Sequence, residues 1–366
     1  MNGTERVDTV VIGAGQAGLA AGYHLSRRKQ EYVILDRYAR VGDVWRNRFE
    51  SLRLYTPAKY DGLPGWPIPG TGWSWPTGTE MADYLEAYAA RFELQVRSGV
   101  AVDRVAKRDG GFVVTSGCRH LEATNVVVAT GGWQTPKTPD FAGELDPGIR
   151  QLHSNDYRNP SQLQPGAVLV VGLAHSGGDV ALELSATHPT TVCGPVRGEI
   201  PFDIEGRAAR MVVPLLWFAA NHVLTQRNPL GRKMRAHVRG EGGPLLRVKR
   251  ADLADAGVEH FEEKVVGVRD GKPMLEDGRV LDVRNVVWCT GFVKDDPWIE
   301  LDVPTDGGWP VQDKGAVPKH PGLYFVGLPF QFAFASMLVG GVGRDAEFVA
   351  KAIAKRARQT QAAVSA

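Results

Sequence analysis

Three glycines near the start of the chain stand at the spacing of a phosphate-binding turn. Gly13, Gly15 and Gly18 form the pattern G-x-G-x-x-G directly after the apolar run Thr9 to Ile12. The first glycine permits a tight turn, the second lets backbone approach a pyrophosphate, and the third allows close helix packing. Asp36 closes the next apolar run and can accept a hydrogen bond from a ribose hydroxyl. The set predicts a site for an adenine dinucleotide.

A second pattern of this kind spans Gly172 to Gly177, after the apolar run Val168 to Val171. Ala174 takes the place of the middle glycine, so its methyl group narrows the approach to a pyrophosphate without closing it. The next predicted strand, Thr190 to Cys193, ends in no carboxylate and is followed by Arg197. A missing acid with a nearby arginine favours a 2′-phosphate, which predicts NADPH over NADH.

The elements that must position these turns are strands and helices in alternation. Two further apolar runs end in Thr-Gly, at Thr130-Gly131 and at Thr290-Gly291, and such continuous runs suit parallel strands buried on both faces. We therefore expect an α/β fold with two Rossmann-like dinucleotide-binding domains, the second inserted into the first. The predicted borders are 1–164 with 286–366 for the first domain and 165–285 for the second, which carries a helical apolar insert near 205–240.

Composition excludes several classes of protein. The 366 residues carry a formal net charge of +2, too balanced for a protein that binds a long row of nucleic-acid phosphates. No apolar run approaches the ~20 residues of a membrane-spanning helix. Cys118, Cys193 and Cys289 are too far apart for a disulfide framework, and no His/Cys cluster has metal-ligand spacing. We expect a cytoplasmic protein without a bound metal.

The most apolar stretch of the chain spans residues 211–224. At 14 residues it is too short to span a bilayer. It could cap a substrate cavity, contact a second subunit in a homodimer, or rest on a membrane surface with Arg227, Arg232, Lys233 and Arg235 nearby. We favour a cavity wall or a subunit contact.

The two nested nucleotide patterns resemble flavoproteins that bind FAD and NADPH in two separate domains. The disulfide reductases of that group need two redox cysteines close together, and no two cysteines here are closer than 75 residues. The chain instead resembles flavin-containing monooxygenases, in particular their bacterial and YUCCA-like branch. The fingerprint of that family, FxG followed by HxxxY(K/R), is matched by Phe141, Gly143, His153 and Tyr157.

This resemblance implies a reaction. NADPH reduces FAD, O2 adds to form a C4a-hydroperoxyflavin, and one oxygen atom passes to a small organic substrate such as an amine, a sulfide or a 2-oxo acid. Because the cofactor performs the difficult chemistry, no catalytic side chain of the protein is assigned. Two alternatives stay open: an NADPH oxidase or electron-transfer reductase, and a flavoprotein regulator without enzymatic activity.

The resemblance also implies which residues lie at each site. Those near the flavin are Trp45, Arg46 and Pro57. Those expected to bind FAD are Gly13, Gly15, Gln16, Ala17, Gly18, Asp36, Arg37, Trp45, Arg46, Thr130, Gly131 and Gly327. Those expected to bind NADPH are Gly172, Ala174, His175, Ser176, Gly177, Arg197, Thr290 and Gly291.

Overall fold

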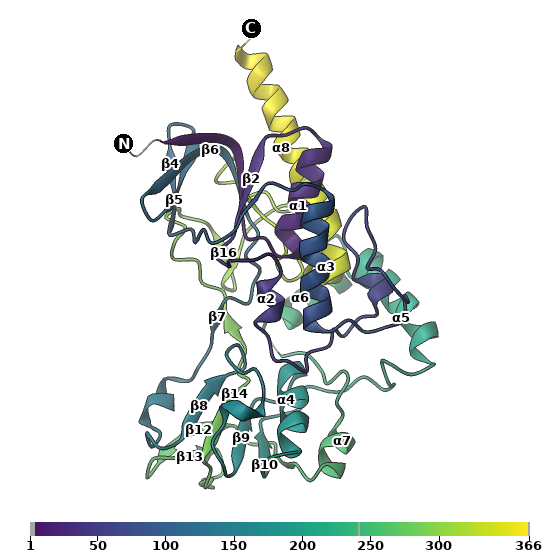
Figure 1. The fold of residues 1–366 in the computed structure, drawn as a ribbon, viewed down its shortest axis with the longest axis vertical. Helices are drawn as coiled ribbons and strands as arrows, with labels where there is room; N and C mark the ends of the chain where they lie inside the picture. The colour runs from purple at the N-terminus through teal and green to yellow at the C-terminus, as the bar shows by residue number, and fades with distance from the viewer. Residues whose placement is uncertain (1–3, 241, 365–366) are drawn as a thin grey trace.

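Two separate sheets divide the chain into two units that meet at a narrow waist (Figure 1). The computed structural model describes residues 4–240 and 242–364. The unit that carries both ends of the chain is built on one sheet, and a second sheet lies beyond the waist. The α/β class and the pair of Rossmann-like units are thereby confirmed.

The first sheet has the strand order β3-β2-β1-β6-β5-β4, and β18 pairs with the end of β6. Its parallel strands are β1 (Glu5–Ile12), β2 (Tyr32–Leu35), β3 (Val96–Arg97), β6 (Arg119–Val128) and β18 (Leu323–Phe325). The strands β4 (Arg104–Arg108) and β5 (Gly111–Ser116) form an antiparallel hairpin. Helices α1 (Gln16–Arg27), α3 (Gly78–Arg91) and α8 (Val342–Val364) share one hydrophobic core against this sheet.

The second sheet is parallel throughout, in the order β11-β10-β9-β14-β8. Its strands are β8 (Arg150–His153), β9 (Val168–Val171), β10 (Thr190–Cys193), β11 (Glu259–Phe261) and β14 (Asn285–Trp288). Helices α4 (His175–Ser185) and α7 (Arg250–Asp255) pack beside it, and β12 (Val265–Arg269) forms a hairpin with β13 (Lys272–Leu275). All four residues of β9 and of β14 are buried, as expected for strands covered on both faces.

The sheet pairing moves the border between the two units outward from the predicted 165–285. β8 pairs with β14, and β14 pairs with β9, so residues 150–153 and 285–288 belong to the second sheet. Local sequence could not show this, because partner strands in a parallel sheet are far apart along the chain. Two crossings between the units lie side by side, where β7 (Thr135–Pro136) pairs with β15 (Phe292–Val293), and the insert near 205–240 adds two more.

The insert near 205–240 is helical, with α5 (Ala209–Phe218), a π-helical turn (Ala219–Val223) and α6 (Pro229–Gly240). Although it interrupts the second unit in sequence, it packs against the first. The amide of Phe334 donates to the carbonyl of Leu224 at 2.9 Å, and the amide of Gln226 donates to the carbonyl of Phe332 at 2.9 Å. Across the described residues, no helix is long and apolar enough to cross a membrane.

Candidate functional site

The first glycine turn joins β1 to α1, and its three glycines have different surroundings. Gly13 has φ +105°, and a Cβ on Gly18 would lie 1.8 Å from the carbonyl oxygen of Gly13. A Cβ on Gly15, by contrast, would meet no atom within 4 Å. The first and third glycines are therefore required by the turn itself, whereas the second leaves open space for a ligand.

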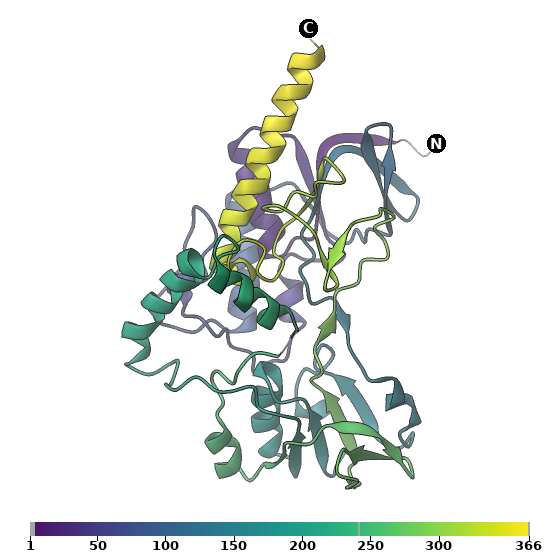
Figure 2. The same ribbon diagram turned by 180° about the vertical axis from the view of Figure 1, so that it is seen from behind.

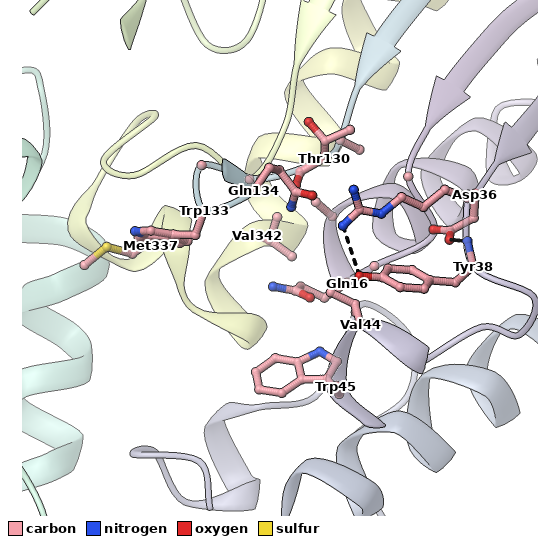
Figure 3. A pocket seen from close by; sticks show the side chains of 18 of the residues that line it. Gln16, Asp36, Tyr38, Val44, Trp45, Thr130, Trp133, Gln134, Met337 and Val342 are labelled. Atoms are coloured by element: carbon pink, nitrogen blue, oxygen red, sulfur yellow. Dashed lines mark hydrogen bonds between the residues drawn. The ribbon is translucent and has the colours of Figure 1, made fainter. Parts of the chain in front are cut away.

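A cavity of about 690 Å³ opens in front of this turn. Figure 3 shows Asp36 and Tyr38 toward one end of it, Trp133 and Met337 toward the other, and Trp45 on a further side. The volume is within the range of cofactor sites, roughly 300 to 1,000 Å³. Predicted residues in its wall are Gly13, Gly15, Gln16, Ala17, Asp36, Arg37, Trp45, Thr130, Gly131, Ser176 and Gly327.

Asp36 is held at the cavity by two backbone amides. Its Oδ2 accepts from the amide of Ala14 at 2.5 Å, and its Oδ1 accepts from the amide of Tyr38 at 2.8 Å. Burial raises the pKa of Asp36 above its usual range, and the amides of Ala14 and Tyr38 oppose that shift. The carboxylate is thus a fixed acceptor at the carboxyl end of β2, where a ribose hydroxyl would reach it.

Two buried donors in the cavity wall have no partner among the described residues. The indole Nε1 of Trp45 and the hydroxyl of Thr130 are both buried and make no hydrogen bond there. Buried polar groups normally have partners, so these atoms fit a ligand that carries acceptors. A flavin with its ribityl chain and pyrophosphate offers such acceptors, and the residues present therefore fit FAD.

The second glycine turn, between β9 and α4, repeats the geometry of the first. Gly172 has φ +101°, and a Cβ on Gly177 would lie 1.9 Å from the carbonyl oxygen of Gly172. Ala174 stands at the N-cap of α4 in extended conformation, like Gly15 at the N-cap of α1. Of this turn only Ser176 reaches the cavity.

The surroundings of the second turn differ from those of the first. Gly242 and Gly243 lie over it: a Cβ on Gly242 would be 3.5 Å from the Cβ of Ala174, and one on Gly243 would be 2.5 Å from Nε2 of His175. The Nε2 of His175 is buried without a hydrogen-bond partner in the described chain, and burial lowers the pKa of the ring below its usual range. The His175 ring also packs on the ring of Tyr55, at 5.1 Å between centroids.

Strand β10 ends without an acidic residue, but the carboxylate of Glu262, which follows the neighbouring strand β11, lies close to its end. The amide of Val196 donates to Oε2 of Glu262 at 3.3 Å, and Glu262, just beyond β11, forms an ion pair with Arg250. Arg197 is exposed on the same loop. Glu199 is close as well, since its Oε2 accepts from the amide of Arg250 at 3.2 Å. Two arginines and two glutamates therefore lie around the end of β10.

A polar network that sequence reasoning did not identify joins the two units beside the cavity. The hydroxyl of Tyr55 donates to Oδ2 of Asp179 at 2.7 Å. Arg247 donates to the carbonyl oxygen of Leu54 at 2.7 Å and to Glu205 at 2.9 Å. No local signal marks these residues, because Tyr55 and Asp179 are 124 positions apart.

Two residues expected near the flavin lie elsewhere. The guanidinium of Arg46 donates to the carbonyl of Val41 at 2.7 Å and to Asp83 at 2.7 Å, so it faces α3 and not the cavity. Nearby carboxylates attract the guanidinium outward, so Arg46 has no contact with the cavity. Pro57 is not in the cavity wall, although Leu54, Tyr55 and Thr56 just before it are.

The connector residues Phe141, Gly143, His153 and Tyr157 lie outside the cavity wall. The ring of His153 is bonded through Nε2 to the carbonyl of Gly291 at 3.0 Å, and burial lowers the pKa of this histidine. Tyr157 is fully buried and donates to Glu183 at 2.8 Å. Phe141 packs edge-on against Trp288, whereas Gly143 is exposed.

Thr290 lies where the chain returns to the first unit, and its hydroxyl donates to the carbonyl of Lys137.

Metal and thiol chemistry find no support in the described residues. No group of three or more His, Cys, Asp or Glu side chains there could hold a metal ion. Cys118, Cys193 and Cys289 are free and none lies in the cavity wall.

Two nucleotide-type turns that face one cavity from two Rossmann-like units define a dinucleotide-dependent flavoprotein of the oxidoreductase class. The family described as pyridine nucleotide-disulphide oxidoreductase matches residues 10–199, and the chain belongs to this family. The chain is also similar to flavin monooxygenases, among both its relatives and its structural neighbours.

Three relatives illustrate that relationship. An uncharacterized CzcO-like oxidoreductase of Geobacillus kaustophilus is 37% identical, over 94% of this chain and 97% of that protein. The probable indole-3-pyruvate monooxygenase YUCCA3 of Arabidopsis thaliana is 29% identical over 95% of this chain and 86% of its own. The structure of a flavin-containing monooxygenase from Stenotrophomonas maltophilia aligns with a TM-score of 0.77 and 26% identity, covering 97% of this chain and 100% of that one.

Proposed function

We propose that this chain is an FAD- and NADPH-dependent monooxygenase that transfers one oxygen atom from O2 to an amine, a sulfide or a 2-oxo acid. The observation that carries the proposal is the shared cavity, in which the first glycine turn and Ser176 of the second turn face the same space. A ligand of each turn can therefore meet the other there. The similarity to YUCCA3 and to the Stenotrophomonas enzyme supports oxygen transfer over other flavin chemistry.

The first unit would hold the FAD. The amides at the start of α1 face the pyrophosphate, Asp36 accepts from the ribose, and Trp45 and Thr130 donate to the flavin end. When bound, the flavin takes electrons from a nicotinamide and activates O2. The protein's own contribution is to bind, to orient and to exclude water, and Met337 and Val342 supply apolar wall for that purpose.

NADPH is favoured over NADH by the charges around the second turn. Arg197 and Arg250 carry two positive charges there, and Glu199 and Glu262 carry two negative charges, of which that of Glu262 is paired with Arg250. A 2′-phosphate would gain charge-assisted contacts with an arginine, whereas a ribose hydroxyl would meet in Glu262 a carboxylate that already has a partner.

The network of Tyr55, Asp179 and Arg247 would position the two units. Arg247 binds the carbonyl oxygen of Leu54, which lies in the cavity wall, while Asp179 stands on α4 directly behind the second turn. This arrangement supports a fixed distance between the two bound cofactors, which hydride transfer requires.

The test is a measurement of what the protein does with O2. FAD-loaded protein should consume NADPH, and the NADPH consumed should match oxygenated product within a panel of amines, sulfides and 2-oxo acids. Rapid mixing of the reduced protein with O2 should give a transient absorption unlike that of oxidised or reduced flavin. Stoichiometric H2O2, with no product from any substrate class, would favour an NADPH oxidase. Failure to consume NADPH, together with redox-dependent binding of a protein partner, would favour the regulator.

A further inference from the structure

The helical insert exposes several large apolar side chains. Met211, Leu215, Phe218 and Leu230 have exposed fractions of 73%, 72%, 60% and 54%. Leu216 and Val223 add 51% and 40%. Six such side chains within twenty positions form a concentration of exposed apolar residues, and patches of this kind mark interaction sites. We call the exposed face of residues 207–239 the insert face.

The opposite side of the insert is tied firmly to the first unit. Trp217 packs on Tyr60 with ring centroids 5.0 Å apart, and Arg344 donates to the carbonyl of Asn221 at 2.7 Å. A β-bridge joins Thr225 to Ala333. Figures 1 and 2 both place α5 at the flank of the molecule, at about the height of β7. The insert face is thus a supported surface that points outward.

No residue of 205–240 lies in the wall of the cavity, so the interpretation of 211–224 as a cavity wall is wrong for this cavity. The physical reason is that the insert packs on the outer side of the segment 328–344, with that segment between it and the cavity. A partner surface is the remaining role for its apolar side chains.

The charges of the insert face have a single sign. Between residues 206 and 240 the sequence contains no Asp or Glu. The adjoining segment 62–79 contains no charged residue of either sign. Five exposed basic residues of the insert have no ion pair with a carboxylate in the described parts of the chain: Arg207, Arg210, Arg227, Arg232 and Lys233.

This charge pattern distinguishes between possible partners. A symmetric contact between two copies would bring the insert faces together and set one basic rim against another, which is repulsive. An anionic surface, in contrast, attracts the basic residues while the apolar side chains enter it. The helix α5 has only 10 residues, and no described helix could span a bilayer, so contact would be at the surface.

We propose that the insert face docks this protein on a membrane surface that contains anionic lipids. Met211, Leu215 and Phe218 enter the boundary between headgroups and acyl chains. The basic residues around them, among them Arg232 and Lys233, pair with lipid phosphates. This inference does not depend on the oxygen-transfer reaction.

The experiment is sedimentation of the full-length, FAD-loaded protein with vesicles. Vesicles of phosphatidylcholine with about one third phosphatidylglycerol should carry the protein down at low salt, and vesicles of phosphatidylcholine alone should carry down far less. Each basic residue near an anionic surface contributes roughly a fivefold change in partitioning, so Arg232→Glu with Lys233→Glu should weaken binding about 25-fold or more. The pair Leu215→Ser with Phe218→Ser should abolish binding that survives in high salt.

Matched controls separate docking from general charge and from misfolding. Lys355→Glu with Arg358→Glu reverses two exposed charges on α8, and Val266→Ser removes an exposed apolar side chain far from the insert. Both should bind vesicles like the parent, and all variants should keep the parent's flavin content and thermal midpoint. The proposal is overturned if the parent does not sediment with anionic vesicles, or if control and insert variants lose binding equally. It is also overturned if light scattering shows a dimer that Leu215→Ser with Phe218→Ser dissociates and vesicles do not bind.

Discussion

The two glycine turns share one backbone design but have different surroundings. In each, the third glycine lies against the carbonyl of the first: a Cβ on Gly18 would come within 1.8 Å of that oxygen, and one on Gly177 within 1.9 Å. The first turn has open space at Gly15 and a fixed carboxylate, Asp36, at the end of the next strand. In the second turn, the methyl of Ala174 and the overlying Gly242 fill the corresponding space. The nearby carboxylate belongs to Glu262, which follows β11 and not β10.

The two turns share the contacts that pack the helix against the strand, but they differ in the residues that would bind a ligand. The contacts that the two turns share hold a helix against a strand, and those in which they differ face the ligand. Substitutions at shared positions should therefore act alike in both units, and substitutions at differing positions should affect one cofactor only.

The largest effect is expected at the shared third glycine. Gly18→Ala and Gly177→Ala would each force a methyl group into a backbone carbonyl, so each should lower the free energy of unfolding by ~3 kcal/mol or more. Chemical denaturation measures this. Gly143→Ala is the matched control, since a Cβ there would meet nothing within 4 Å. A normal stability for either variant would contradict the close contact.

The second-largest effect is expected at the middle position of each turn, which is Gly15 in the first and Ala174 in the second. Gly15→Val should leave the fold intact, because no atom lies within 4 Å of its Cβ, yet it should block the cavity. FAD affinity should fall about a hundredfold, on the order of 3 kcal/mol. Ala174→Val should instead retain FAD and weaken NADPH. Titration of apoprotein with FAD, followed by NADPH titration, distinguishes them, and equal loss of FAD in both would refute the assignment of the turns.

The third effect tests the charges at the end of β10. Arg197→Ala should reduce the preference for NADPH over NADH by about ten- to hundredfold, the value of a lost charge-assisted hydrogen bond. Steady-state kcat/KM for both nucleotides measures the preference. Arg207→Ala, an exposed arginine on the insert, is the control and should leave it unchanged. A preference that survives Arg197→Ala would move the phosphate contact to Arg250.

The smallest effect concerns the contribution of the second turn to acid sensitivity. His175 follows Ala174, whereas Gln16 follows Gly15. Because burial lowers the folded-state pKa of His175, its contribution to stability is present above the ordinary pKa of ~6.5 and is lost as pH falls toward the lowered value. His175→Gln should therefore reduce the acid-side fall in thermal midpoint by about 2 to 4 °C. Identical pH profiles for parent and variant would exclude His175 as the group responsible.

Much of the first unit's candidate site was predictable because its determinants are local. Gly13, Gly15 and Asp36 lie within one strand-turn-helix-strand unit, where spacing and position are coupled by regular geometry. Arg46 shows the limit of such reasoning. Its backbone lies beside Trp45 in the cavity wall, but three carboxylates, Asp43, Asp83 and Glu86, turn its side chain to the outer face.

By itself, the amino-acid sequence determined that two dinucleotide turns exist, that one is nested within the other, and that the chain resembles flavin monooxygenases. These properties follow from glycine spacing and from apolar runs, which act through backbone sterics over a few residues. Only the tertiary structure decided that β8 and β14 join the second sheet, that Glu262 reaches the loop after β10, and that the insert packs on the first unit. Each of these depends on contacts between residues tens to hundreds of positions apart, and no local pattern encodes such contacts.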